Sequence, residues 1–145
     1  MAQYVSEVMT PTVTAVRPDA SLVEAAELMR SHDIGDVVVA QDGRLLGVLT
    51  DRDITLRAVA EGADPLTVSA VSVCTPEPVT VGPDEPVAAA VMLMRTHAVR
   101  RLPVVREGEP LGMVSIGDLA QEEDPGSALA DISRASPDSW PARTG

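Results

Sequence analysis

The pattern of apolar and polar positions divides the first half of the chain into five short elements. A strand is expected around residues 13–16. Apolar residues then recur at helical spacing over residues 22–29, which predicts an amphipathic helix packed on a core. Ser21 precedes this helix and Glu24 follows three residues later, which is the pattern of a capping box.

Two apolar runs follow, at residues 37–40 and 45–50, and Asp42-Gly43 between them is typical of the turn in a β-hairpin. A second helix is expected to begin near Asp51 and to run towards Gly62. The first half of the chain is therefore predicted to form strand, helix, strand, strand and helix in that order.

The same pattern returns 65 positions later. A shift of 65 aligns residues 5–54 with residues 70–119 without a gap, and 16 of the 50 paired positions are identical, where chance matching gives on the order of three. In the second copy Pro86 lies at the expected start of the helix, and the first position of a helix tolerates proline. Pro103 falls in an apolar run, which is therefore expected to be an edge strand or to carry the proline in its first residues. The chain is predicted to be an internal duplication.

Shifts in composition suggest where the two units end. Residues 61–72 connect the copies, so the first unit is expected to span residues 1–66 and the second residues 67–122. The tail, residues 123–145, is richer in charge and proline, and one short helix is expected at residues 128–135. Disorder and docking on a partner subunit are the two alternatives for this tail.

Composition narrows the range of functions. Phe is absent and Tyr4 and Trp140 are the only aromatic residues, so a base-binding pocket would have to use aliphatic contacts in place of ring stacking. A net charge of −11 opposes binding to nucleic acid and to anionic membranes. All eleven basic residues are arginine, which excludes Schiff-base chemistry at a lysine.

The expected location is the cytoplasm. Cys74 is the only cysteine, so an internal disulfide cannot form, and a reducing compartment is favoured. The N-terminus lacks the pattern of a signal peptide, and no apolar run approaches the ~18 residues of a membrane span.

A hydroxyl and a carboxylate recur at the end of the third strand of each copy, as Thr50 with Asp53 and as Ser115 with Asp118. The N–H groups at the start of the following helix favour an anion. The aspartate could accept from a diol while the hydroxyl and the N–H groups hold a phosphate, and a nucleotide carries both groups. Simple helix capping explains the same residues and is the alternative.

With these features the chain resembles the cystathionine β-synthase (CBS) domain family. The resemblance covers residues 5–122 and is carried by Met9-Thr10-Pro11, Val16-x-Pro18-Asp19, Leu28-Met29, His32-x-Ile34-Gly35, residues 100–105 and the stretches 47–53 and 112–118. It implies an α+β fold in which two β-α-β-β-α motifs, each with a small three-stranded sheet, form a pseudo-two-fold CBS pair, or Bateman module. Two clefts would lie between the motifs.

The resemblance also implies a stand-alone regulatory protein with no catalytic residues. Clefts in this family bind AMP, ADP, ATP or S-adenosylmethionine, with Mg²⁺ as an optional companion of a polyphosphate. A homodimer is expected to transmit binding to a regulated protein partner whose identity the sequence does not give. By position, Asp53 and Asp118 match the residues that hold ribose, and Thr50 and Ser115 match those that face phosphate.

Further candidates differ between the copies. Arg100 and Arg101 match family positions that face the phosphates, and guanidinium groups suit that role; ordinary surface charge is their alternative. Their counterparts are Gly35 and Asp36. Since an aspartate repels a phosphate, the arginine-bearing cleft is expected to favour a charged nucleotide. Arg52, whose counterpart is glycine, is a weaker candidate.

Ala25 and Ala90 are small enough to admit a flat base and are equally suited to an ordinary core. His32 and His97 are explained by interaction with a helix C-terminus, and no spacing of cysteine and histidine suggests structural zinc. A structural or stress-associated dimer with empty clefts is the alternative function. Enzymatic activity is disfavoured because no nucleophile-His-acid order, metal set or Gly-rich phosphate loop is present.

Overall fold

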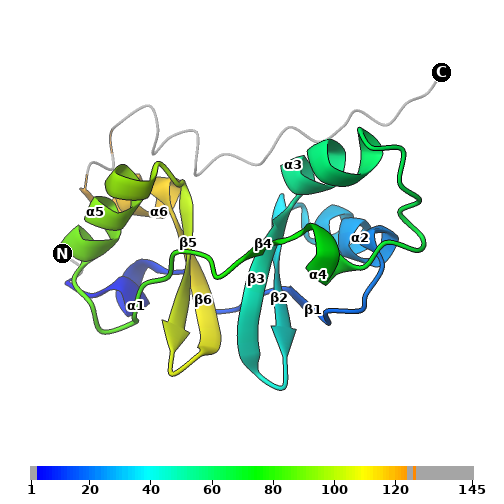
Figure 1. Ribbon diagram of the computed structural model, residues 1–145. Helices are drawn as coiled ribbons and strands as arrows, with labels where there is room; N and C mark the ends of the chain where they lie inside the picture. Colours follow the sequence, from blue (N-terminus) through cyan, green and yellow to red (C-terminus); the bar gives the residue numbers. More distant parts are fainter. Residues whose placement is uncertain (1–2, 124–125, 127–145) are drawn as a thin grey trace.

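The computed structural model describes residues 3–123 and residue 126. The helix expected at residues 128–135 and the rest of the tail after residue 126 lie outside the described residues. The fold is α+β, as predicted: two small sheets stand side by side, each with helices on its outer side (Figure 1).

The first sheet has four strands in the order β1-β2-β3-β4. These are β1 (Ala15–Val16), β2 (Asp36–Gln41), β3 (Arg44–Thr50) and β4 (Thr75–Pro76). β1 pairs with β2 in parallel, and the other two pairings are antiparallel. The predicted hairpin turn is confirmed: Asp42 and Gly43, between β2 and β3, have φ angles of 53° and 77°. β4 was not predicted, and it comes from the second copy of the repeat.

The second sheet consists of β5 (Arg101–Arg106) and β6 (Glu109–Ser115), which pair antiparallel. The strand that the repeat predicts here, as the equivalent of residues 13–16, is reduced to one parallel bridge between Val81 and Val104. In the first motif the N–H of Val38 donates to the carbonyl of Thr14 over 2.9 Å. Pro103 is the residue equivalent to Val38 and has no N–H, so the second motif cannot form this bond and its strand is shorter.

The predicted long helices are α2 (Leu22–His32) and α5 (Val87–His97), each burying one apolar face. Ser21 Oγ accepts from the N–H of Glu24 over 3.1 Å, so the serine cap is confirmed. Pro86 is the N-cap of α5 and does not occupy its first turn.

The second helices are α3 (Asp51–Ile54), which continues as a π-helix (Thr55–Val59), and α6 (Ile116–Glu123). The π-helical turn buries Ala58 and leaves Leu56 and Val59 exposed.

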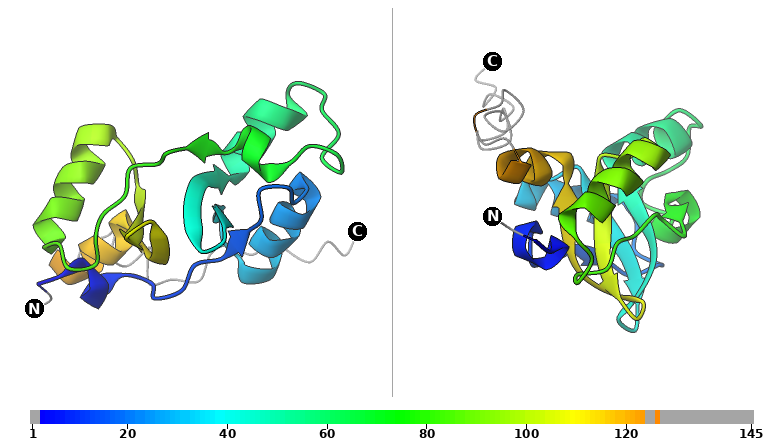
Figure 2. Two further views of the ribbon diagram at one scale, coloured as in Figure 1. Left: turned by 60° about the horizontal axis from the view of Figure 1, so that its bottom comes forward. Right: turned by 90° about the vertical axis from the view of Figure 1, so that its left-hand side faces the viewer.

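Two short helices were not predicted, and each packs on the other motif's core. These are α1 (Val5–Val8) and α4 (Ala70–Val73). Val5 belongs to the core of the second motif, whereas Ala70, Val73 and Cys74 belong to the core of the first. Figure 1 shows α4 beside β3, and both views in Figure 2 place α1 beside α6. The two motifs therefore exchange their N-terminal segments.

Gly47 and Gly112, which are equivalent in the repeat, lie where the exchanged segments cross the sheets. A Cβ added at Gly47 would lie 2.6 Å from Cys74 Sγ and 2.7 Å from the Thr75 carbonyl oxygen. At Gly112 it would meet the carbonyl of Thr10, whose backbone pairs with Met113. Only glycine allows so close an approach. None of the described helices has the length and apolar character needed to cross a membrane.

Candidate functional site

Both strand-to-helix junctions form reciprocal hydrogen bonds between the hydroxyl and the aspartate. Asp53 Oδ2 accepts from the N–H of Thr50 over 3.0 Å, and Thr50 Oγ1 accepts from the N–H of Asp53 over 3.0 Å. The corresponding bonds between Ser115 and Asp118 are 2.9 and 3.1 Å long. The capping alternative is thus realised in both motifs. Each aspartate uses only one carboxylate oxygen, Oδ2, for the cap.

The second oxygen of Asp53 has a cation beside it. Arg57 Nη2 lies 3.7 Å from Asp53 Oδ1, and Arg57 Nη1 donates to the Val73 carbonyl over 2.9 Å and to Thr75 Oγ1 over 3.3 Å. Arg57 therefore ties Asp53 to the exchanged segment that follows α4. The sequence reasoning did not select Arg57, whose counterpart in the repeat is Glu122.

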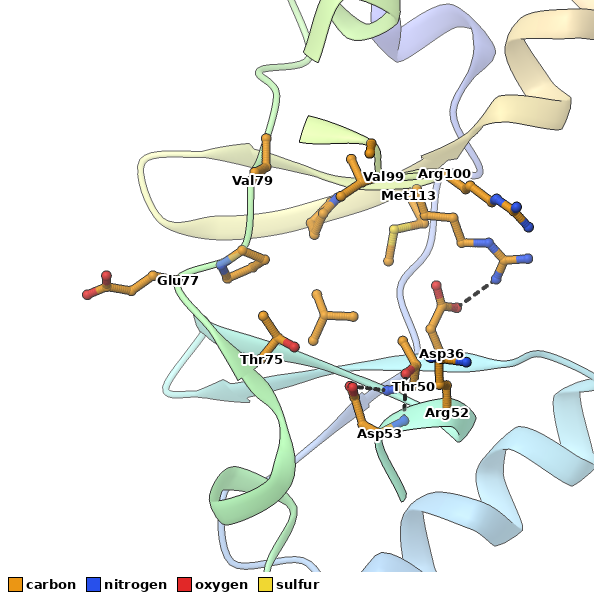
Figure 3. A pocket seen from close by; sticks show the side chains of 15 residues that line it. Asp36, Thr50, Arg52, Asp53, Thr75, Glu77, Val79, Val99, Arg100 and Met113 are labelled. Atoms are coloured by element: carbon orange, nitrogen blue, oxygen red, sulfur yellow. Dashed lines mark hydrogen bonds and ion pairs between the residues drawn. The ribbon is translucent and has the colours of Figure 1, made fainter. Parts of the chain in front are cut away.

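A cavity of about 770 Å³ opens between the two motifs and is called the first cleft here. Its polar side carries Asp36, Thr50, Arg52 and Asp53 from the first motif and Arg100 from the second (Figure 3). Arg101 of the second motif also lines it. Its volume falls within the ~300–1,000 Å³ typical of small-molecule sites.

The remaining wall of the first cleft is mostly aliphatic. It contains Val48, Val79, Val99, Pro103 and Met113. Thr75 and Glu77, from the exchanged segment, complete the wall, and Figure 3 shows the Glu77 side chain pointing away from the other residues. Sequence reasoning missed this segment, although the identity of Thr10 and Thr75 in the repeat was a signal for it.

A second cavity, of about 340 Å³, is lined by several residues that are equivalent in the repeat to those of the first cleft. It is called the second cleft. Ser115 and Asp118 line it, together with His32, Asp36 and Arg101. Three threonines, Thr10, Thr12 and Thr14, form much of its remaining polar surface. The two clefts thus contain the two hydroxyl-aspartate pairs separately, one pair each.

Asp36 and Arg101 line both clefts and form an ion pair. Arg101 Nη1 lies 3.1 Å from Asp36 Oδ1, with 10% of the Asp36 side chain and 50% of the Arg101 side chain exposed. The two residues are equivalent in the repeat, at the first positions of β2 and β5.

Three of the remaining candidates lie away from the cleft surfaces. Ala25 and Ala90 are fully buried in the two cores, so the adenine-pocket interpretation is wrong and the core alternative holds. They point inwards because they lie on the buried faces of α2 and α5. Gly35 does not line either cleft; its carbonyl accepts from the N–H of Asp51 over 2.9 Å.

Cys74 belongs to the exchanged segment and is buried in the core of the first motif. Burial raises the pKa of its thiol, the nearby Asp53 carboxylate raises this pKa further, and Arg57 lowers it in part. Within the residues that the structure describes, no three His, Cys, Asp or Glu side chains are grouped as metal ligands.

Comparison with known proteins gives consistent matches over the described region. A family model for the CBS domain matches residues 5–59 and 68–124. The CBS domain-containing protein YhcV of Bacillus subtilis is 41% identical over 133 residues, which are 89% of this chain and 94% of YhcV. Hypoxic response protein 1 of Mycobacterium tuberculosis is 36% identical over 116 residues, covering 79% of this chain and 81% of that protein.

Two solved structures have the same fold. Hypoxic response protein I with two coordinated zinc ions superposes with a TM-score of 0.75 at 35% identity, over 81% of this chain and 97% of that one. The CBS domain pair of protein MJ0100, in complex with 5′-methylthioadenosine and S-adenosylmethionine, gives a TM-score of 0.73 at 23% identity, over 82% and 94% of the two chains.

Proposed function

The chain belongs to the CBS domain family, and from this premise we propose that it is a regulatory protein that binds an adenosine nucleotide in the first cleft. One observation carries the proposal. The cleft joins a hydroxyl and a carboxylate of one motif, Thr50 and Asp53, to Arg100 and Arg101 of the other motif, opposite an aliphatic wall.

The polar groups suit a ribose followed by phosphates. Asp53 Oδ2 is used by the helix cap, which leaves Oδ1 to accept from ribose hydroxyls. Thr50 Oγ1 accepts from Asp53, so its own proton is free to donate to a phosphate oxygen. Within the described residues the side chains of Arg52 and Arg100 have no hydrogen-bond or ion-pair partner. Both can therefore turn to an anion.

The aliphatic wall suits a base. Val79, Val99 and Met113 offer an apolar surface, and no aromatic side chain lines the cleft in the described part of the chain. A purine would be held by burial against aliphatic groups, and the expected affinity is micromolar or weaker, about −8 kcal/mol at 1 μM. AMP, ADP, ATP and S-adenosylmethionine are the ligands to test, with Mg²⁺ added to the polyphosphates.

Regulation requires that the ligand distinguish two arrangements of the protein, because a ligand that binds both equally shifts neither. The proposed arrangements are those of a homodimer. The presence of S-adenosylmethionine and 5′-methylthioadenosine in the related MJ0100 pair supports the binding of adenosine ligands by this fold. The role is one of binding and signalling, with no catalytic step.

The repeat supplies a matched pair of variants to test the site. Asp53→Asn and Asp118→Asn each alter a helix cap of nearly the same geometry, but only Asp53 lines the first cleft. Isothermal calorimetry should show that Asp53→Asn binds ATP with an affinity lower by about tenfold or more, because a hydrogen bond to a charged group contributes ~1.5–3 kcal/mol. Asp118→Asn should stay within about twofold of wild type, since it lies outside the first cleft.

Equal losses in the two variants, or a loss confined to Asp118→Asn, would contradict the assignment to the first cleft. A wild-type melting temperature unchanged by AMP, ATP and S-adenosylmethionine, in a protein that still dimerises, would instead support the structural or stress-associated dimer with empty clefts.

A further inference from the structure

We propose that Arg101 is shared between the two clefts, so that an anionic nucleotide in the first cleft excludes an anionic ligand from the second and leaves it to uncharged or cationic nucleosides. This inference rests on the proposed function of the first cleft. It adds a coupling between the clefts and a ligand class for the second one.

The repeat explains why one arginine can serve two sites. Asp36 and Arg101 are equivalent residues at the starts of β2 and β5, so the pseudo-two-fold relation between the motifs brings them together midway between the clefts. Their side chains form the 3.1 Å ion pair, and each of the two residues lines the first cleft as well as the second. Half of the Arg101 side chain is exposed, whereas Asp36 is nine-tenths buried.

The two clefts depend on Arg101 to different degrees. The first cleft has Arg52 and Arg100 in addition. Among the described residues that line the second cleft, Arg101 is the only arginine, and the carboxylates of Asp36 and Asp118 line the same cleft. An anion in the second cleft therefore needs Arg101, while an anion in the first cleft can recruit it alongside two other guanidinium groups.

Recruitment of Arg101 to a phosphate in the first cleft changes the charge of the second. The arginine must weaken its contact with Asp36, which leaves a buried carboxylate without its cation in a cleft that the Asp118 carboxylate also lines. Such a pair repels phosphate and accepts a neutral or positively charged group. By linkage, an anion bound in the second cleft weakens binding in the first by the same factor.

The test compares two arginine-aspartate pairs of equal length. Asp36→Asn releases Arg101, and Asp84→Asn breaks the 3.1 Å pair between Arg106 and Asp84, which lines neither cleft. Calorimetric titrations with ATP are run under identical conditions for the three proteins. Wild type and Asp84→Asn should bind the first ATP per chain with similar affinity. Asp36→Asn should bind a second ATP about tenfold more tightly than wild type does, within the ~5–150-fold range of coupling between sites.

A second titration probes ligand class. ATP-saturated wild type should still bind one 5′-methylthioadenosine per chain, and Asp118→Asn should lose this second site. Two ATP molecules binding wild type with similar affinity would overturn the shared arginine and leave the proposed function intact, as would identical behaviour of Asp36→Asn and Asp84→Asn. Absence of any ATP binding would overturn the proposed function, and this inference with it.

Discussion

Gly47 lies where the segment after α4 crosses β3, and its replacement by alanine should destabilise the protein by about 2 kcal/mol. The new Cβ would lie 2.6 Å from Cys74 Sγ and 2.7 Å from the Thr75 carbonyl oxygen. Neither atom can move easily, because Cys74 is buried and the backbone of Thr75 pairs with Val48. Relief of the clash must therefore separate the exchanged segment from the sheet.

Urea unfolding followed by far-UV circular dichroism measures the effect. For a slope of about 2 kcal/mol/M, a loss of about 2 kcal/mol lowers the midpoint by about 1 M. Gly82→Ala is the control: its Cβ would meet Glu85 Oε2 at 3.4 Å, an ordinary contact. This variant should be unchanged or more stable by ~0.4–1 kcal/mol, because alanine restricts the unfolded chain.

Equal midpoints for Gly47→Ala and Gly82→Ala would refute the argument, since only the first replacement meets immovable atoms. Thr75 also lines the first cleft. A displaced segment should therefore weaken ATP binding by Gly47→Ala as well.

Two further predictions concern the second sheet and the buried thiol. Pro103→Val restores a backbone N–H at the position equivalent to Val38, whose N–H donates to the carbonyl of Thr14 in the first motif. The new amide should therefore be hydrogen-bonded and exchange slowly with solvent. Fast, unprotected hydrogen exchange at position 103 would contradict this. Burial raises the pKa of Cys74 in the folded state, so its contribution to stability is complete below the pKa of a free thiol, ~8.5, and is lost as the pH rises further. The free energy of unfolding should fall between neutral pH and about pH 9.5 in wild type, and Cys74→Ala should lack this fall.

Features that depend on neighbours in sequence could be predicted. The hairpin turn at Asp42 and Gly43 and the serine cap at Ser21 each involve residues no more than a few positions apart. The duplication then transferred the turn and the hydroxyl-aspartate pair to the second copy. The serine cap did not transfer, because Pro86 replaces Ser21 there and makes no side-chain cap. Periodicity reports local geometry, so it performed well for these elements.

Features that depend on contacts between the motifs could not be predicted from the sequence. Hydrophobic periodicity does not show that Val5 packs in the second core or that Thr75 lines the first cleft, because these contacts join residues far apart in the chain. Arg100 could be named as a phosphate candidate, but its place opposite Asp53 follows only from the packing of the two motifs. Ala25 shows the converse: small size suits a pocket and a core equally, and only burial decides between them.

The exchange of α1 and α4 has a consequence for how the chain folds. A fragment ending at residue 66 would lack Ala70, Val73 and Cys74 from its interior, and the complementary fragment would lack Val5. Neither half is self-sufficient, despite the ancestry that the repeat implies. The molecule should melt in a single cooperative step, and separated halves should regain structure only when mixed, as in fragment complementation.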